Sequence, residues 1–316
     1  MRSTSYLVLL ALAAAACSPE HPTADGKGPL FAKATVDDGA QLVAFMDGVN
    51  ASLGSSGADY RVALAEYQTL TGGDAVGATL LQKDVGNKRL GADFVPFDAR
   101  RPWSGPVVDG TDNITFAIDQ TGDAVPPSTV VVPITAAQTT AAIRSAMATW
   151  DGETCSDLGT TENGTGGLDV GVVAFLNGLG GSPFVFADIQ DAGWRDINFA
   201  GGILGVTFTF IFVSGGTPTD IDGDGLADVA FREIYYDPSF IWRVDGGNVD
   251  VESVALHESG HGLSQAHFGN IFQRNDGTFD ASPRAVMNAF YQSPFRALTG
   301  TDDGGHCGNW ANWPNN

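Results

Sequence analysis

Apolar side chains recur along the chain in two spacings, and each spacing predicts one kind of element. Helical spacing predicts helices at residues 37–53, 135–150 and 251–263. Alternating or continuous apolar runs predict strands at residues 60–67, 76–81, 114–118, 184–189, 206–213 and 229–236. The glycine-rich stretch at residues 159–181 predicts loops. Helices and strands mix without strict alternation, which favours an α+β fold with a twisted mixed sheet.

The first predicted elements form a unit of their own. One helix and a hairpin fall within residues 31–98, and a proline-containing stretch, residues 99–112, follows them. We therefore expect a small N-terminal α/β unit, a linker, and a larger domain over residues 113–316. The small unit is a candidate pro-segment that shields the cleft of the larger domain, and an exosite domain or a spacer is the alternative.

The N-terminus has the pattern of an export signal. Residues 1–16 combine a positive start with a short apolar core and small residues before Cys17. The apolar run is too short to span a membrane. Small residues directly before Cys17 also resemble a bacterial lipoprotein signal, so Cys17 is a candidate lipidation site, with plain secretion as the alternative. Residues 17–30 are then a polar tether.

Cysteine content and charge agree with an exported chain. If Cys17 carries lipid, two cysteines remain, and in an oxidising compartment Cys155 and Cys307 are predicted to form a disulfide. The net charge of −21 argues against nucleic acid and anionic membrane surfaces as partners. We expect a monomer, in the cell envelope or outside the cell, that contacts a membrane only through the anchor at Cys17.

The segment from His257 to His267 points most directly to chemistry. His257 and His261 lie one turn apart on the predicted helix, so their rings can meet at one point. Gly262 allows the chain to turn back and bring in His267 as a third ligand. Three imidazoles suit Zn²⁺ and leave a fourth position for water, from which the neighbouring Glu258 could take a proton as general base. The alternative is a set of ordinary core or surface histidines.

This segment resembles the metzincin zinc peptidases, and among them the matrixins. The resemblance rests on the HExxHxxxxxH pattern from His257 to His267, and on Met287 at the place of the methionine turn. In matrixins a Met-x-Pro-x-Tyr segment forms the wall of the S1′ pocket; here Tyr291 keeps the tyrosine spacing and the proline is lost. The resemblance covers about residues 113–316 and implies a metzincin-like catalytic domain with one catalytic zinc.

Three features depart from that family. Ser264 stands where the family has a glycine that eases the turn between the second and third ligands, and serine adopts such a backbone only at some cost. Phe268 follows the third ligand, where matrixins commonly have serine. No cysteine lies between Cys17 and Cys155, so a cysteine switch is absent. Ser264 therefore bears on whether His267 can reach the other two histidines.

A second pattern suggests calcium. Carboxylates and one backbone carbonyl are spaced as in a calcium loop at Asp220, Asp222, Asp224, Leu226 and Asp228. The twelfth position is Phe231 rather than glutamate, so the full EF-hand is absent. A structural Ca²⁺ is expected, and a charged surface turn is the alternative. Only His21 and His306 remain outside the triad, so no second, structural zinc is predicted.

Together these features predict a secreted or lipid-anchored zinc endopeptidase that hydrolyses protein or peptide substrates with zinc-activated water. The alternative is a catalytically weak, metal-stabilised surface binding or adhesion protein on the same scaffold. Peptidases of this type bind substrate as an added antiparallel strand at a sheet edge. Residues 229–236 are a candidate for that edge, or else an ordinary half-buried strand.

Overall fold

The computed structural model describes most of the chain. The described residues are 36–71, 77–82, 92–104, 114–127, 133–156, 158–197, 199 and 201–315. The predicted signal, the tether and Cys17 lie outside them. Among the described residues, no helix is long enough and apolar enough to cross a membrane.

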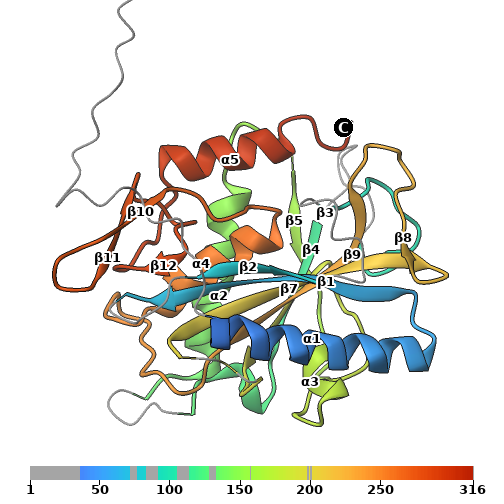
Figure 1. Ribbon diagram of the computed structural model, residues 1–316, viewed down its shortest axis with the longest axis horizontal. Helices are drawn as coiled ribbons and strands as arrows, with labels where there is room; N and C mark the ends of the chain where they lie inside the picture. The colour runs from blue at the N-terminus through green and yellow to red at the C-terminus, as the bar shows by residue number, and fades with distance from the viewer. Residues whose placement is uncertain are drawn as a thin grey trace, which may run out of the picture.

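Within this part of the chain, a ten-stranded mixed sheet runs through the centre (Figure 1). Its strands are β1 (Tyr60–Leu70), β2 (Ala78–Leu81), β3 (Ala92–Asp93), β4 (Ile114–Ile118), β5 (Thr160–Glu162), β6 (Ile189–Trp194), β7 (Ile203–Ser214), β8 (Thr217–Pro218), β9 (Ala227–Tyr236) and β12 (Phe290–Tyr291). The order is β12-β1-β7-β9-β6-β4-β5, with β2 on β1, β3 on β9 and β8 on β7. A separate hairpin joins β10 (Asn270–Gln273) to β11 (Phe279–Ser282).

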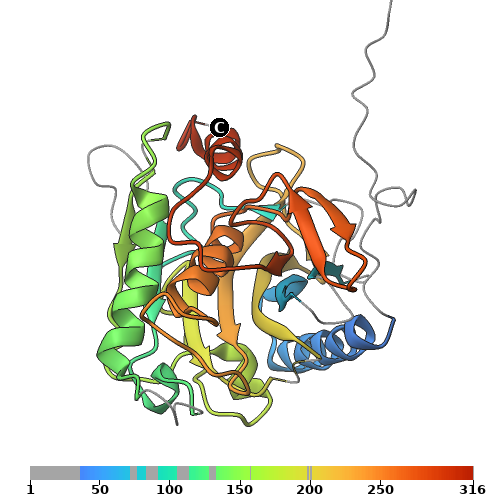
Figure 2. The same ribbon diagram turned by 90° about the vertical axis from the view of Figure 1, so that its left-hand side faces the viewer.

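Helices cover both faces of the sheet. They are α1 (Val36–Ser56), α2 (Ala136–Asp151), α3 (Val172–Leu176), α4 (Val251–Gly262) and α5 (Gly300–Trp310), with a 3₁₀ turn, η2 (Gly122–Ala124). One core lies between the sheet and the pair α2 and α4, and a second lies under α1 and α3. Figure 2 shows α2 and α1 on opposite sides of the sheet. The α+β prediction is confirmed.

Local sequence explains where the two helices of the first core begin. Thr135 caps α2 in a capping box with Gln138, and the carboxylate of Asp250 accepts the backbone N–H of Ser253 at the start of α4. Strand β7 is buried along nearly its whole length, as its continuous apolar sequence predicts for a central strand. The bounds of α2, α4 and β7 agree with the predicted ranges to within a few residues.

Two predicted elements are placed differently. Residues 184–188 precede the strand instead of forming it, because side chains take their backbone bonds: Asn163 donates to the carbonyl of Phe186, and Gln190 accepts the Phe186 N–H. Residues 172–176 form a short helix where loops were expected. The Glu233 carboxylate accepts two N–H groups at its first turn, which satisfies donors that a helix start leaves free.

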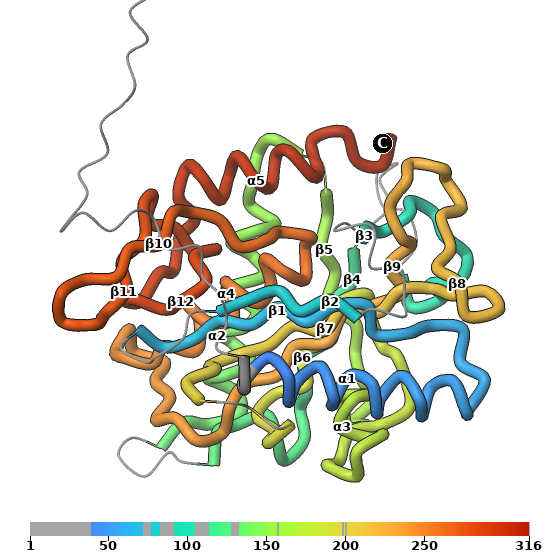
Figure 3. The backbone as a smooth tube through the Cα atoms, viewed as in Figure 1, coloured from blue at the N-terminus to red at the C-terminus, as the bar shows by residue number. Residues whose placement is uncertain are grey.

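The N-terminal unit is built into the same sheet. Figure 3 lets the chain be followed from α1 into β1, which lies between β12 and β7. Of the stretch predicted as a linker, the structure describes residues 99–104, and Arg101 among them is buried and pairs with Asp188 at 2.7 Å. Strand β1 of the predicted small unit thus shares one sheet with strands of the predicted larger domain.

Residues 229–236, one interpretation of which was a substrate edge, do not lie at an edge of the sheet. Residues 229–236 belong to β9, which pairs with β7 on one side and with β6 on the other. Every residue of β9 after Ala227 is buried, so its side chains pack on both faces of the sheet. The pattern at 229–236 was that of an interior strand.

The predicted disulfide is present. Cys155, just after α2, is bonded to Cys307 of α5, with their Cα atoms 5.6 Å apart. It joins the C-terminal helix to the body of the protein near the first core.

Candidate metal centre

The three predicted zinc ligands converge. His257 and His261 extend from α4, and His267 comes from the segment that follows it. Their Nε2 atoms form a triangle with all three separations 3.1 Å. That spacing suits three nitrogens sharing one ion at Zn–N distances of about 2.0–2.1 Å. The structure thus shows a histidine group that could hold a metal ion.

The turn to the third ligand is made in spite of Ser264. Its φ of 63° is left-handed, the conformation that the family's glycine would adopt without a Cβ. A buried guanidinium supports the turn, because Arg232 Nη1 donates to Gly262 O at 2.7 Å and to Ser264 Oγ at 2.9 Å. The turn thus brings His267 Nε2 to 3.1 Å from the other two Nε2 atoms, and no sequence pattern indicates the contribution of Arg232.

Backbone carbonyls orient the first two rings. His257 Nδ1 lies 2.7 Å from Val286 O, and His261 Nδ1 lies 2.7 Å from Gln265 O. An Nδ1–H that donates to a carbonyl leaves Nε2 as the free lone pair, which is the tautomer a metal requires.

Burial keeps the imidazoles neutral. It lowers the pKa of His257 to about 4, and it lowers the pKa values of His261 and His267 well below the usual range, with the neighbouring rings acting in the same direction. Neutral rings keep their lone pairs for a metal across the physiological pH range.

Met287 lies directly beneath the metal helix. A Cβ at Gly260 would fall 2.4 Å from Met287 Sδ, so glycine at that position lets the methionine turn approach α4. The turn is held by Asp302 of α5, whose carboxylate accepts the backbone N–H groups of Val286 and Met287 at 3.1 Å. Asp302 follows Met287 by 15 residues, and no periodic spacing in the sequence links the two.

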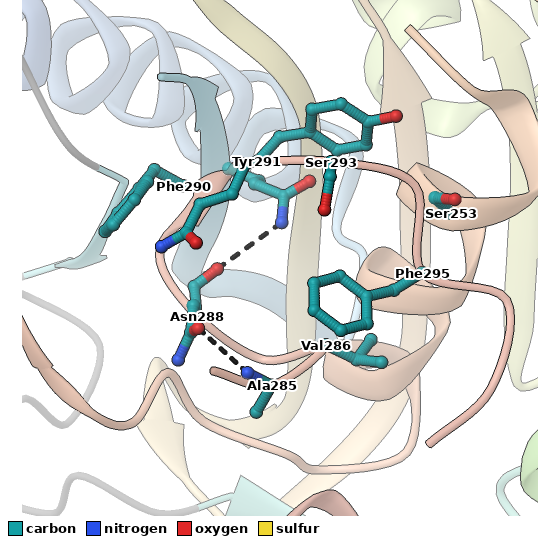
Figure 4. Close-up of a pocket in the computed structure, with 10 residues that line it drawn as sticks. Ser253, Ala285, Val286, Asn288, Phe290, Tyr291, Ser293 and Phe295 are labelled. Carbon is teal, nitrogen blue, oxygen red and sulfur yellow. Dashed lines mark hydrogen bonds between the residues drawn. The ribbon is translucent and has the colours of Figure 1, made fainter. Parts of the chain in front are cut away.

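Tyr291, the candidate S1′ residue, lines a small pocket beside the histidine group (Figure 4). Its hydroxyl accepts the Asp250 N–H at 3.1 Å, and the side chain of Asn288 closes the turn by accepting the Ala285 N–H at 2.9 Å. The pocket has room for about one water molecule. Its lining residues are Gln68, Ser253, Ala285, Val286, Asn288, Phe290, Tyr291, Gln292, Ser293 and Phe295.

Glu258 is fully buried between α4 and the sheet. Thr207 Oγ1 donates to its Oε2 at 2.7 Å, while Oε1 has no hydrogen-bond partner among the described residues. Burial raises the pKa of Glu258 well above its usual value, and the carboxylate of Glu66 adds to that rise. A Cβ at Gly205 would lie 2.8 Å from Oε1, so glycine there makes room for the carboxylate.

Strand β1 covers the metal centre, which sequence reasoning missed. Gln68 Nε2 lies 3.0 Å from His257 Nδ1, and Glu66 Oε2 lies 3.4 Å from His261 Nδ1. Burial raises the pKa of Glu66 to about 7. These residues stand almost two hundred positions before the histidines, and nothing in their local pattern links the two segments.

The calcium-loop residues are brought together only in part. Asp220, Asp222 and Asp224 form one exposed carboxylate group. Asp228 lies apart from it, buried and paired with Arg100 at 2.7 Å. Asp93 of β3 lies near the exposed group, and burial together with Asp224 and Asp222 raises its pKa to about 7.

Comparison with models of known protein families finds no match for this chain, and comparison with curated proteins finds no similar sequence. The function therefore has to be argued from the site itself.

Proposed function

We propose that this chain is a zinc-dependent endopeptidase of the metzincin type, similar to the matrixins. The observation that carries the proposal is the triangle of Nε2 atoms, 3.1 Å apart. The helix that supplies two of these histidines also carries a buried carboxylate, Glu258, with one oxygen free of hydrogen bonds among the described residues. Met287 packed beneath α4 and Tyr291 at a neighbouring pocket support the same assignment.

In this proposal each residue of the site would have a separate role. His257, His261 and His267 would hold the zinc, which when bound supplies Lewis acidity and lowers the pKa of water to about 7. Glu258 would accept a proton and pass it to the leaving amine, a task that its raised pKa suits. Thr207 would fix the orientation of the carboxylate by donating to Oε2. The pocket beside Tyr291 would receive a substrate side chain.

One observation favours the second candidate, a metal-stabilised binding or adhesion protein with weak catalysis. His257, His261 and Glu258 are all 0% exposed, and β1 lies against them. A site that stayed closed could retain zinc without admitting a peptide.

Substitution of Glu258 by glutamine separates the two candidates. Zinc content should be unchanged, because Glu258 is not a ligand, while hydrolysis of an unfolded protein substrate should fall by at least about a hundredfold. Glu252→Gln, on the same helix and beside Arg296, is the matched control and should leave hydrolysis intact. Equal digestion by parent and Glu258→Gln would refute the peptidase assignment, and zinc retained without hydrolysis in the parent would favour the binding protein.

We further propose that the chain is exported, with a lipid on Cys17 or by plain secretion, and that it acts as a monomer on protein or peptide substrates. A Ca²⁺ ion at Asp220, Asp222 and Asp224 belongs to the same proposal, supported by their grouping at one exposed turn. The mass of the mature N-terminal peptide distinguishes the lipidated form from the free one.

A further inference from the structure

Strand β1 lies where an added peptide strand would lie beside this metal centre. It pairs antiparallel with β7, from Tyr60 opposite Phe212 to Thr69 opposite Ile203. On its other side it pairs antiparallel with β2 over residues 64–67 and in parallel with β12, where Leu70 lies opposite Tyr291 of the candidate pocket wall. A peptide bound by strand addition would make its main-chain hydrogen bonds to β7 and β12.

The side chains of β1 point alternately to the two faces of the sheet, as those of a bound peptide strand would. Glu66 and Gln68 point towards α4, and Tyr67 between them is buried in the core under α1, as strand alternation requires. Gln68 lines the pocket beside Tyr291 and donates to Asn288 O at 3.4 Å.

Occupation of this groove closes the site. With β1 in place, Glu258 is 0% exposed and the adjoining pocket has room for only about one water molecule. No peptide bond of a substrate can reach the carboxylate unless β1 moves. The strand is held from behind by α1, whose Met46 is fully buried in one core with Val62 and Tyr67 of β1.

We infer that the groove between β7 and β12 is the substrate groove, that its substrates are extended peptide segments, and that β1 fills it as an internal stand-in. This inference rests on the proposed peptidase function and adds its regulation: the intact chain is latent, and the site opens when the α1–β1 unit leaves the sheet. The pocket beside Tyr291 would receive the substrate side chain that takes the place of Gln68, which lines the pocket here.

The test weakens the α1–β1 unit from a position remote from the site. Met46→Ala removes a buried side chain beneath α1, and Met147→Ala removes an equally buried one from α2 as the matched control. For the full-length, zinc-loaded protein, three quantities are measured: hydrogen exchange of β1 amides, zinc release to a chromogenic chelator, and hydrolysis of an unfolded protein. Met46→Ala should raise all three by at least about tenfold, and Met147→Ala should leave the hydrogen exchange of the β1 amides unchanged.

A synthetic peptide with the sequence of residues 61–70 provides a second measurement. Added to Met46→Ala, it should suppress the gained hydrolysis and slow zinc release, and a scrambled peptide should do neither. If Met46→Ala does not fold, urea below the unfolding transition of the parent replaces it, and zinc release should then rise in step with β1 exchange.

The outcomes separate the two proposals. Faster β1 exchange with unchanged zinc release overturns the inference, and so does full hydrolysis by a parent chain whose β1 amides remain protected. Faster zinc release without hydrolysis in Met46→Ala leaves the shielding by β1 standing and refutes the peptidase function.

Discussion

Ser264 is the residue at which two opposing effects can be measured against each other. Its left-handed backbone, with φ of 63°, costs a residue with a Cβ about 1–2 kcal/mol relative to glycine. Its hydroxyl acts in the other direction, because Oγ accepts a 2.9 Å hydrogen bond from the buried guanidinium of Arg232. A hydrogen bond to a charged group contributes about 1.5–3 kcal/mol.

Two substitutions separate these effects. Ser264→Ala loses the hydrogen bond and keeps the left-handed backbone, so it should destabilise the protein by about 1.5–3 kcal/mol. The value should lie at the lower end, because Arg232 Nη1 keeps a second acceptor in Gly262 O. Ser264→Gly loses the same bond and relieves the backbone, so it should be about 1 kcal/mol more stable than the alanine variant. The expected order is therefore parent, glycine, alanine.

The assay is urea unfolding of the zinc-free protein, with zinc affinity measured by competition in parallel. Ser145, exposed within α2, is the control: in the interior of a helix the glycine variant should be about 1 kcal/mol less stable than the alanine variant, the reverse of the order at Ser264. An alanine variant as stable as the glycine variant at 264 would show that the backbone is not left-handed in solution, and the account of the turn would fail.

Three further predictions concern separate parts of the fold. Burial raises the pKa of Asp191 to about 7, so the stability that this carboxyl contributes is complete below pH 3.8 and is lost as pH rises through 7. In the parent, the free energy of unfolding should therefore fall by an amount on the order of 4 kcal/mol between pH 4 and pH 8. Asp191→Asn should remove this fall in urea unfolding, and an unchanged pH profile would contradict the prediction. Ca²⁺ at ten times its Kd should stabilise the parent by about 1.4 kcal/mol at pH 7.5 in thermal unfolding, and Asp222→Asn should show no such gain. Reduction of Cys155–Cys307, separated by 152 residues, should lower the free energy of unfolding by up to about 5 kcal/mol, and a Cys155→Ser, Cys307→Ser variant should match the reduced protein.

The sequence was sufficient for features set within one turn or one strand. The spacing of His257 and His261 on a helix determines that their rings share a face, and the structure places them so. The continuous apolar run of β7 likewise predicts a central strand, since only burial on both faces accommodates it. The disulfide followed from counting cysteines in an exported chain and needed no knowledge of the path between them.

Features that join distant segments could not be predicted from one sequence. The pattern of residues 60–67 correctly indicates a strand, but strand pattern does not choose a partner, and the pairing of β1 with β7 depends on a core shared with α1. The place of residues 229–236 in the sheet was left open for the same reason, because a buried interior strand and a half-buried edge strand differ mainly in their neighbours. Gln68 and Asp302 entered the site only through this long-range pairing and packing.

The burial of the three histidines and Glu258 has two effects: it sets the pKa values of these groups, and it closes the site to substrate. Exclusion of water keeps the three imidazoles neutral and raises the pKa of Glu258, the two conditions that the proposed reaction needs. Much of that exclusion comes from β1, which would have to leave before a peptide could bind. A peptide strand in the place of β1 would restore the exclusion, so a bound substrate would recreate the environment that this structure shows around Glu258. Whether the chain is a peptidase or a metal-stabilised binding protein therefore depends on the opening of the α1–β1 unit, and not on its ligand set.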